Sequence, residues 1–564
     1  MTTTQSKPTR PHHETGHEPD ADVIILGAGL AGSVLGAVLA RNGAKTLLID
    51  AGSHPKFAVG ESMIGYTLLL LRSIAERYGV PEIATLATFD SCVSEINHSF
   101  GWKKHFGFLR HEMGKEPNWW EAAQLNTPGV LNKSSHLFRQ DTDTYLFHTA
   151  VRYGCDVKLG HLVTDVEVTD DGVLVRGKDG SEFRGRYLVD ASGFRSPLAA
   201  KLGLREEPSR LKHHSRSIFT HMIDVPRADD VLWHSDAQRP PVPWHHGTMH
   251  HHFDRGWFWV IPFGNNPRST NSLCSVGLTM DERKYPKSER LSPEAEFFEF
   301  ASRFPAVRRQ FAGAKPVREW VSTSRLQYSS TRSIGPRWCL MSHAAGFIDP
   351  LFSRGISNTA EVINALGWRL LEALADDDFS VERFEYIERL EQGLLDYNDD
   401  LVNSAFISFD HYELWSAVFR VWAYGSVVGG NRLQSALARF RQTGDDGHLR
   451  ALEDPPNVGL WWPDHDGYKK LFDDMVANTA AVDAGTRDPA EAAQRLFAHL
   501  KSADYIPHKF GFSDIEKRFL KPDAKSLISL LGWILRQAPA DVREIYLDTA
   551  KEVVKAVAAG RRAF

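Results

Sequence analysis

The sequence is poor in cysteine and has no long apolar run. Four cysteines occur in 564 residues, at Cys92, Cys155, Cys274 and Cys339, and no two of them form a C-x-x-C pair. This spacing excludes a disulfide framework or a zinc ribbon and favours reduced thiols in a cytoplasmic protein. No apolar run approaches the roughly 20 residues that a membrane helix needs, so we expect no membrane partner. Residues 1–20 are polar, without an apolar signal core, and we expect a disordered tail.

The sequence also lacks a large excess of positive or negative charge. The net charge is −5, from 66 Lys and Arg against 71 Asp and Glu. A nucleic-acid surface needs a concentrated basic field, so we expect no nucleic-acid partner. Hydrophobic residues make up 42% of the chain and charged residues 24%, which is the composition of a soluble globular enzyme with a large core.

Strand-like and helical patterns divide the rest of the chain. We expect a dinucleotide-binding core over 21–365 and a helical C-terminal region over 366–564. Within the core, residues 205–330 alternate strand-like segments with Pro- and Gly-rich loops, which predicts a β-rich region. The alternation of strands and helices before residue 205 predicts an α/β fold of the Rossmann type.

A glycine-rich turn opens the core. Gly27, Gly29 and Gly32 follow the apolar run "VIIL" and precede a helical pattern, and Asp50 ends the next strand-like segment. The glycines let the backbone approach a pyrophosphate at a helix N-terminus, and an acid at this distance accepts hydrogen bonds from a ribose. The motif predicts a dinucleotide and leaves FAD and NAD both open.

Two further strand–loop–helix units extend this pattern. They are "DASGFRS" at 190–196 and "GFIDP" at 346–350, and the three units together resemble flavoprotein monooxygenases of the p-hydroxybenzoate hydroxylase type. The resemblance implies FAD, with Asp349 beside the ribityl chain and Arg139 near the cofactor. The Gly-Asp pair usual in the third unit is replaced here by Ser342-His343.

Two tryptophans stand two residues apart in "GWFWVIP", which begins at Gly256. On a strand, Trp257 and Trp259 lie on one face. Large apolar residues in such a pattern are most often core aromatics, and periodicity alone favours that interpretation.

The same stretch matches the G-W-x-W-x-I-P signature of flavin-dependent halogenases. The similarity continues in "HPKFAVGES" at 54–62, "GWKKHFGF" at 101–108 and "DPLFSRGISNT" at 349–359. It runs over nearly the whole chain, which resembles most the halogenases of tetracycline and pyrrolnitrin biosynthesis. The resemblance implies a p-hydroxybenzoate hydroxylase-like FAD-binding fold.

The resemblance implies a chlorination that uses oxygen, chloride and FADH2 from a separate flavin reductase. Enzyme-generated hypochlorous acid would reach a lysine beside a small aromatic substrate. Lys103 aligns with that lysine, and Lys104 would point to the opposite face if this segment is a strand. Burial would lower the pKa of the lysine, and a neutral amine is the better nucleophile toward chlorine.

Several other residues acquire expected roles from the resemblance. The backbone around Ser353, Arg354 and Gly355 would bind chloride near a helix start, or Ser353 would simply cap that helix. The expected cofactor contacts are Gly27, Gly29, Gly32, Asp50, Glu61, Ser62, Arg139, Asp349 and Ile356. The expected partition between flavin and substrate consists of Trp257, Trp259, Pro262 and Phe352.

Phe352 also bears on the substrate. Tryptophan halogenases carry an acid at this position, and Phe352 cannot act as a base, so the resemblance favours a phenol or pyrrole over free tryptophan. Our leading hypothesis is chlorination of a phenolic, tetracycline-type polyketide. The alternatives are a pyrrole halogenase, an FAD-dependent aromatic hydroxylase and a flavin-binding protein without turnover.

Five histidines precede the tryptophan stretch, at 245, 246 and 250–252. Imidazole is a common metal ligand. No cysteine or acid stands at a familiar ligand spacing around these histidines, and adjacent strand residues face opposite sides, so we expect pocket or strand histidines and no metal site.

Overall fold

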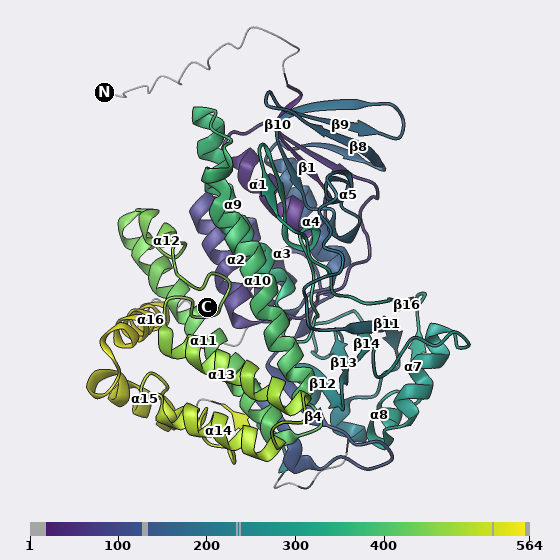
Figure 1. The fold of residues 1–564 in the computed structure, drawn as a ribbon, viewed down its shortest axis with the longest axis vertical. Helices are drawn as coiled ribbons and strands as arrows, with labels where there is room; N and C mark the ends of the chain where they lie inside the picture. The colour runs from purple at the N-terminus through teal and green to yellow at the C-terminus, as the bar shows by residue number, and fades with distance from the viewer. Residues whose placement is uncertain (1–18, 127–133, 233–234, 236–237, 522–523, 559–564) are drawn as a thin grey trace.

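The computed structural model describes residues 19–126, 134–232, 235, 238–521 and 524–558. Most of the predicted N-terminal tail lies outside these residues. Figure 1 shows two sheets, one above the other in the view, with long helices packed along their side.

The first sheet is the predicted dinucleotide-binding sheet. Its strands run in the order β17-β18-β10-β1-β2-β7, and the four pairs from β18 to β7 are parallel. The predicted strand–turn–helix–strand unit is confirmed as β1 (Ala21–Leu26), α1 (Leu30–Arg41) and β2 (Thr46–Asp50). Every residue of β1 is buried, as expected for a parallel strand covered on both faces. The other strands are β7 (Asp156–Leu159), β10 (Glu182–Asp190), β17 (Ile334–Gly335) and β18 (Trp338–Leu340).

The second sheet is mostly antiparallel and runs in the order β15-β11-β14-β13-β12-β4-β5-β19, with the short strands β15 (Lys315–Pro316) and β19 (Phe519–Leu520) at its two ends. At its centre lies β13 (Gly256–Pro262), which contains the two tryptophans. The predicted β-rich character of residues 205–330 is confirmed, but the sheet extends further, because β4 and β5 come from a part of the chain before residue 205 that we did not assign to this sheet. The strands around β13 are β4 (His105–Arg110), β5 (Ala122–Asn126), β11 (Ser215–Ile223), β12 (Thr248–Phe253) and β14 (Cys274–Asp281).

The two faces of the second sheet have different neighbours. Trp257 and Trp259 pack toward the C-terminal helices, in a core with Trp415. Phe258 and Val260, on the opposite face, pack against α7 (Pro293–Ser302) and α8 (Pro305–Gln310) in a separate core. The period-two alternation of the strand therefore divides one sheet between two hydrophobic cores.

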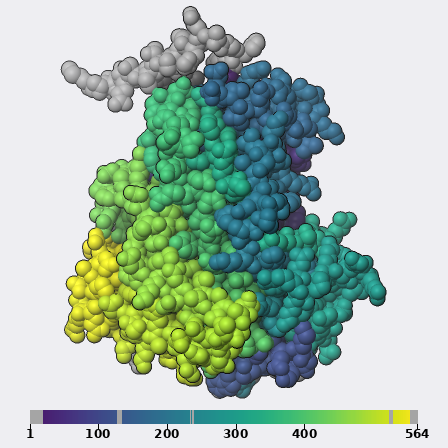
Figure 2. All heavy atoms as spheres, in the orientation of Figure 1, coloured from purple at the N-terminus to yellow at the C-terminus, as the bar shows by residue number. Residues whose placement is uncertain are grey.

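The C-terminal part is helical, as predicted. In Figure 2 its green and yellow atoms cover one side of the molecule beside the two sheets. Among the described residues, no helix combines the length and the apolarity that a membrane crossing requires. The division into domains at residue 365 stays a prediction. The main helices are α9 (Gly355–Asp376), α10 (Val381–Ser408), α11 (Tyr412–Thr443), α13 (Asp466–Asp483), α14 (Pro489–Ser502), α15 (Ala524–Arg536) and α16 (Ala540–Ala558).

Candidate active site

The glycine turn between β1 and α1 has the geometry that a dinucleotide requires. Gly27 has a φ of +95°, and a Cβ there would come within 2.7 Å of the Ala191 carbonyl oxygen. A Cβ at Gly32 would overlap the carbonyl oxygen of Gly27, so this glycine permits α1 to pack onto the turn. A Cβ at Gly29 would meet no atom within 4 Å, which leaves open space at the N-terminus of α1. These residues fit a bound pyrophosphate.

Asp50 ends β2 beside this turn. Its Oδ2 accepts a hydrogen bond from the Ala28 backbone N–H at 2.7 Å, its Oδ1 accepts one from Gly52, and Lys56 forms an ion pair with it. Burial favours the neutral acid, but the bond and charge of Lys56 outweigh that effect, so the pKa of Asp50 is lowered. A bound ribose would therefore share the Asp50 carboxylate with Lys56. The ion pair between Lys56 and Asp50 was not predicted from the sequence.

Arg139 begins α4 (Arg139–Arg152) and holds the 54–62 segment in place. Its Nε donates to Asp143 at 2.8 Å, and its Nη1 donates to the Val59 carbonyl at 2.6 Å. At the end of the same segment, Glu61 is buried and its Oε1 lies 3.3 Å from Nε2 of His221. Asp143 was not predicted as a partner of Arg139. The spacing of four residues on one helix was the sequence signal for this ion pair.

Asp349 is buried where the first sheet meets the second. Its Oδ2 accepts a hydrogen bond from Ser215 Oγ at 2.8 Å, and its Oδ1 accepts one from the Leu351 N–H at 3.0 Å. A cavity of about 30 Å³ brings together Asp349, Gly355 and His343. The predicted neighbourhood of Asp349 and the start of α9 is therefore present.

The unusual Ser342-His343 pair lies in the wall of this cavity. The Ser342 N–H donates to Glu391 Oε1 at 2.5 Å, and Ser342 has a φ of +57°. Burial raises the pKa of Glu391 to about 8 and lowers that of His343 to about 4. Glu391, from α10, thus lies at the corner where Ser342-His343 replaces the Gly-Asp pair usual in the third unit.

The predicted chloride turn precedes α9. The N-cap of α9 is Arg354, so the alternative in which Ser353 caps the helix is wrong; Ser353 has a φ of +53° and its N–H donates to Pro350. The Arg354 side chain is 3% exposed, stacks over Trp461 at 3.9 Å and lies 3.6 Å from a Glu361 oxygen. The first backbone N–H groups of an α-helix have no partner within the helix, so the start of α9 is suited to an anion.

Ile356 follows in the first turn of α9 and is 7% exposed. It packs in the core of the first sheet with Met63 and Leu137. Ile356 therefore lies at the start of α9, beside the predicted halide turn, and its contact with the cofactor stays a prediction.

Lys103 and Lys104 link β3 (Gly101–Trp102) to β4, so the strand on which we based their alternation is interrupted there. Their environments nevertheless differ. Lys103 is 5% exposed, its Nζ donates to the hydroxyls of Ser62 and Thr248, and it lies 3.7 Å from the centre of the Phe106 ring. Burial lowers the pKa of Lys103 well below its usual value.

Lys104 is the less buried of the two lysines. Its Nζ lies 3.3 Å from the centre of the Trp102 ring, and burial lowers its pKa as well. Among the described contacts of Lys103 no carboxylate occurs. The contacts with Phe106 and Thr248 were not predicted; Phe106 lies three residues further along the chain, and Thr248 comes from β12, which is distant in sequence.

The two tryptophans lie beside this lysine on the same face of the sheet. Their ring centroids are 5.5 Å apart, and Trp257 and Trp259 are 2% and 6% exposed. Trp259 Nε1 donates to Ser275 Oγ at 3.2 Å, while Nε1 of Trp257 has no hydrogen-bond partner among the described residues. Ring contacts connect the tryptophans to Lys103: Trp257 contacts His250, and His250 stacks on Phe106 with ring centroids 4.6 Å apart. Phe106 in turn lies against Lys103.

Phe352 closes the same aromatic cluster from the helical side. Its ring centroid lies 4.9 Å from that of Trp422 and 6.3 Å from that of Trp415, both on α11. Trp422 in turn lies 5.1 Å from Phe106, beside Lys103. The sequence of residues 396–415, which ends at Trp415, was expected to frame an aromatic pocket, whereas Trp422 was missed because helical periodicity alone classes it as a core residue.

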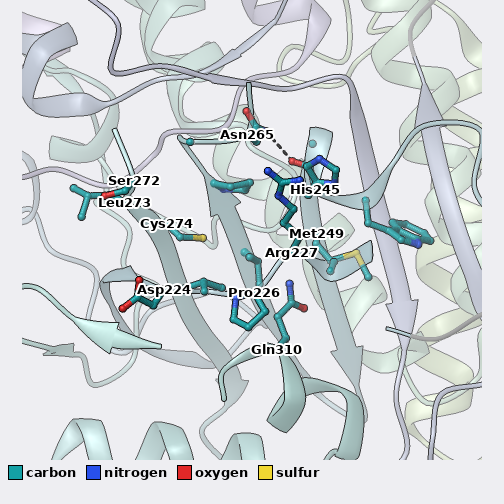
Figure 3. A pocket seen from close by; sticks show the side chains of 17 residues that line it. Asp224, Pro226, Arg227, His245, Met249, Asn265, Ser272, Leu273, Cys274 and Gln310 are labelled. Carbon is teal, nitrogen blue, oxygen red and sulfur yellow. Dashed lines mark hydrogen bonds between the residues drawn. The ribbon is translucent and has the colours of Figure 1, made fainter. Parts of the chain in front are cut away.

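Pro262 belongs to a different surface from the tryptophans. It lines a cavity of about 220 Å³ on the opposite face of β13, together with Arg227, Met249, Cys274 and other residues labelled in Figure 3. The side chain of Pro262 is therefore separate from the aromatic cluster around Trp257. The backbone carbonyl oxygen of Pro262 accepts a hydrogen bond from His136.

The histidines of β12 have three separate environments. His250 stacks on Phe108 and its Nδ1 contacts the Gly107 carbonyl at 2.8 Å, while His251 contacts Gln310 at 2.6 Å. His252 lies against Phe409, with both ring nitrogens lacking a partner among the described residues. In the part of the chain that the structure describes, no three His, Cys, Asp or Glu residues are placed to hold a metal ion.

The parallel sheet, the glycine turn and the attached second sheet define an FAD-binding α/β enzyme. The profile described as Tryptophan halogenase matches residues 118–420. The chain is 55% identical over 532 residues to a tetracycline 7-halogenase of Kitasatospora aureofaciens, covering 94% of this chain and 96% of the relative. It is 46% identical to the monodechloroaminopyrrolnitrin halogenase PrnC of Pseudomonas fluorescens, covering 96% of each.

A solved structure agrees with these relatives. The crystal structure of the halogenase PltM in complex with phloroglucinol and FAD superposes with a TM-score of 0.85 at 34% identity, covering 89% of this chain and 99% of that one. The chain belongs to the flavin-dependent halogenases. The expected enzyme class, fold, cofactor FAD and halide chloride agree with this membership.

Proposed function

We propose that this halogenase chlorinates a phenolic, tetracycline-type polyketide through a lysine-bound chlorine. The observation that carries the proposal is Lys103, a buried lysine enclosed by hydroxyls and aromatic rings. Electron-rich phenols need no base to activate the ring, and Phe352 supplies none. The 55% identity to a tetracycline 7-halogenase supports the polyketide class.

The cofactor would lie along the first sheet. Gly27, Gly29 and Gly32 would hold the pyrophosphate at the start of α1, with Asp50 at the ribose. Arg139, Glu61 and Ser62 would border the flavin from the 54–62 segment, and Asp349 and Ile356 from the α9 side. When bound and reduced by a separate flavin reductase, FAD supplies the activation of oxygen that oxidises chloride to hypochlorous acid.

The chain's own residues then control where that oxidant goes. The backbone N–H groups of Arg354 and Gly355, which follow Ser353 at the start of α9, would hold chloride. Trp257 and Trp259 would keep the aromatic substrate away from the flavin while a small oxidant passes to Lys103. The neutral amine of Lys103 would take the chlorine and pass it to the ring. Helices of the 366–564 region, α11 above all, would close the substrate pocket.

A second candidate is chlorination of a pyrrole. The 46% identity to the monodechloroaminopyrrolnitrin halogenase PrnC favours it. The aromatic cluster around Phe106, Trp415 and Trp422 is compatible with either ring. An aromatic hydroxylase is not favoured, because direct oxygen transfer would require the substrate to reach the flavin past the two tryptophans. We place the reaction in the cytoplasm, where the four cysteines, all free and buried, stay reduced.

The test is substrate profiling with the purified protein, FAD, NADH, a flavin reductase and either chloride or bromide. A tetracycline-type polyketide and aminophenylpyrroles are compared by product mass. We expect halide-dependent addition of one chlorine to the polyketide at a higher kcat/KM than to any pyrrole. Preference for a pyrrole would replace the first candidate by the second, and a mass gain of one oxygen would overturn both.

A further inference from the structure

Four distant segments meet at the amine of Lys103 through a chain of hydroxyls. The Nζ contacts Ser62 Oγ and lies 3.2 Å from Thr248 Oγ1. The two hydroxyl oxygens are 3.0 Å apart. Thr248 Oγ1 is also 3.0 Å from Nε2 of His136, which lies on β6 (Ser135–His136). All four side chains are buried, so their hydrogens must be shared among these groups.

The direction of the hydrogen bonds is set at the far end, by His136. Its Nδ1 lies 2.9 Å from the carbonyl oxygen of Pro262, which can only accept. Nδ1 therefore carries the hydrogen. Burial lowers the pKa of His136 to about 3, so the ring is neutral and Nε2 has no hydrogen. Thr248 must then donate its single hydroxyl hydrogen to His136 Nε2.

This assignment settles what the two hydroxyls present to the lysine. Because Thr248 has no second hydrogen, it accepts from Lys103 and from Ser62. Ser62 in turn donates its hydrogen to Thr248 and accepts from Lys103. Both hydroxyl hydrogens point away from Nζ, and neither is available to the lone pair of a neutral amine.

We propose that His136 and Thr248 are positioning residues that keep hydroxyl hydrogens off the Lys103 lone pair, so that it stays open to electrophilic chlorine. The inference rests on the proposed role of Lys103 as chlorine carrier. It also gives a function to the backbone of the signature proline, because the Pro262 carbonyl selects the tautomer of His136. With the opposite tautomer, Thr248 would turn its hydrogen toward Lys103.

The lone pair is consumed in the first step. It forms the N–Cl bond while the O–Cl bond of hypochlorous acid breaks, and the departing hydroxide takes a proton from nitrogen to leave as water. In the second step the ring attacks chlorine, and the electrons of the N–Cl bond return to Nζ. The ring carbon then loses its proton, and the amine gains one. The net change is replacement of a ring hydrogen by chlorine with formation of one water.

Burial lowers the pKa of Lys103, and the titratable groups around it do not favour its ammonium form. Three histidines face it, His105 from β4, His136 from β6 and His250 from β12. Burial lowers the pKa of His105 to about 3 and that of His250 well below its usual value, so all three rings are uncharged at neutral pH. Among the described residues, no carboxylate contacts Nζ to favour the ammonium form.

The first test compares Thr248→Val with Thr248→Ser in the FAD-loaded enzyme. Chlorinated product per FADH2 oxidised is measured across pH. In Thr248→Val the freed Ser62 hydrogen can turn to the lone pair of Lys103. We therefore expect the plateau of the pH profile, where the yield is highest, to fall by about tenfold, the effect of one net hydrogen bond. The loss of the Thr248 acceptor also lowers the pKa of Lys103, so the acid limb of the profile, where the yield rises with pH, moves to lower pH. Thr248→Ser keeps the hydroxyl and should retain both plateau and limb.

The second test separates the two bonds of His136. His136→Gln can offer an amide oxygen to Thr248, whereas His136→Asn can reach only Pro262. We expect His136→Gln to retain more chlorination per FADH2 than His136→Asn, at unchanged KM for the substrate. If Thr248→Val does not fold, the comparison of His136→Gln with His136→Asn still tests the positioning role.

The outcomes distinguish failure of this inference from failure of the proposed function. If Lys103→Met abolishes chlorination while Thr248→Val behaves like wild type, or lowers the plateau with no shift of the acid limb, the positioning role is wrong. Equal losses in His136→Gln and His136→Asn would overturn it too. If Lys103→Met still chlorinates, the proposed lysine mechanism itself fails.

Discussion

The glycine turn and the lysine site are built in opposite ways. The turn lies within one short stretch, and its requirements are backbone requirements: a positive φ at Gly27 and the absence of a side chain at Gly32. The lysine site joins Ser62 to Thr248, which are 186 positions apart, and every contact is made by a side chain. The backbone motif restricts the side chain at Gly27 and Gly32, whereas an assembled site depends on how several strands are aligned.

The largest effect is expected where the turn is broken. Gly32→Val would force a branched side chain against the carbonyl of Gly27, and we expect a loss of about 3 kcal/mol or more in the free energy of unfolding, the upper end of overpacking costs. FAD binding should fall with it. Thermal unfolding and FAD titration measure both quantities.

Gly29→Ala is the matched control for that change. A Cβ at Gly29 meets no protein atom within 4 Å, so we expect the melting temperature to stay near that of wild type. FAD affinity should still weaken, because the methyl group occupies space that a pyrophosphate needs. A large loss of stability in Gly29→Ala would contradict the distinction between the two glycines.

The next effect concerns the aromatic side of the lysine site. Trp257→Leu would open a cavity at a cost of about 3 kcal/mol, the lower end for such truncations. We expect chlorinated product per FADH2 oxidised to drop while FAD affinity is retained. Trp244→Leu makes the same change in the core on the opposite face of the sheet. If it lowers the yield per FADH2 as much as Trp257→Leu does, the two tryptophans have no role as a partition.

The smallest expected effect is a gain in the free energy of unfolding when Lys103 is replaced by an apolar residue. Burial lowers the pKa of Lys103 in the folded protein, so the unfolded chain binds one more proton between that pKa and about 10.4. Folding therefore loses stability as the pH falls below about 10.4, down to the lowered pKa. At pH 7 we expect Lys103→Met to be more stable than wild type by about 1 kcal/mol, the lower end of the cost of burying a polar group.

Chemical denaturation across pH measures this difference. The advantage of Lys103→Met should shrink as the pH rises toward 10. An advantage that is constant across pH would mean that the gain comes from packing and has no link to the charge of Lys103.

The same contrast explains what the sequence could predict. The glycines, Asp50 and the strand–turn–helix unit could be located because their physical requirements are local. Lys103 and the tryptophans of β13 were located through a signature. Thr248 and His136 were missed because they reach the Lys103 site only through strand pairing and loop packing, such as the parallel register of Thr248 with Phe106, the residue three positions after Lys103. Strand periodicity correctly separated Trp257 from Phe258, but it could not show that β4 joins the same sheet.

The most direct measurement of the central claim is chlorinated product per FADH2 oxidised in Lys103→Met, with Lys104→Met as its neighbour control. Lys103 lies among the hydroxyls and aromatic rings of the site, and Lys104 lies over Trp102. We predict that Lys103→Met loses chlorination by about 100-fold or more, a loss typical of a catalytic side chain, while flavin oxidation continues and Lys104→Met stays close to wild type. Chlorination that survives in Lys103→Met, or that is lost equally in both variants, would contradict the account.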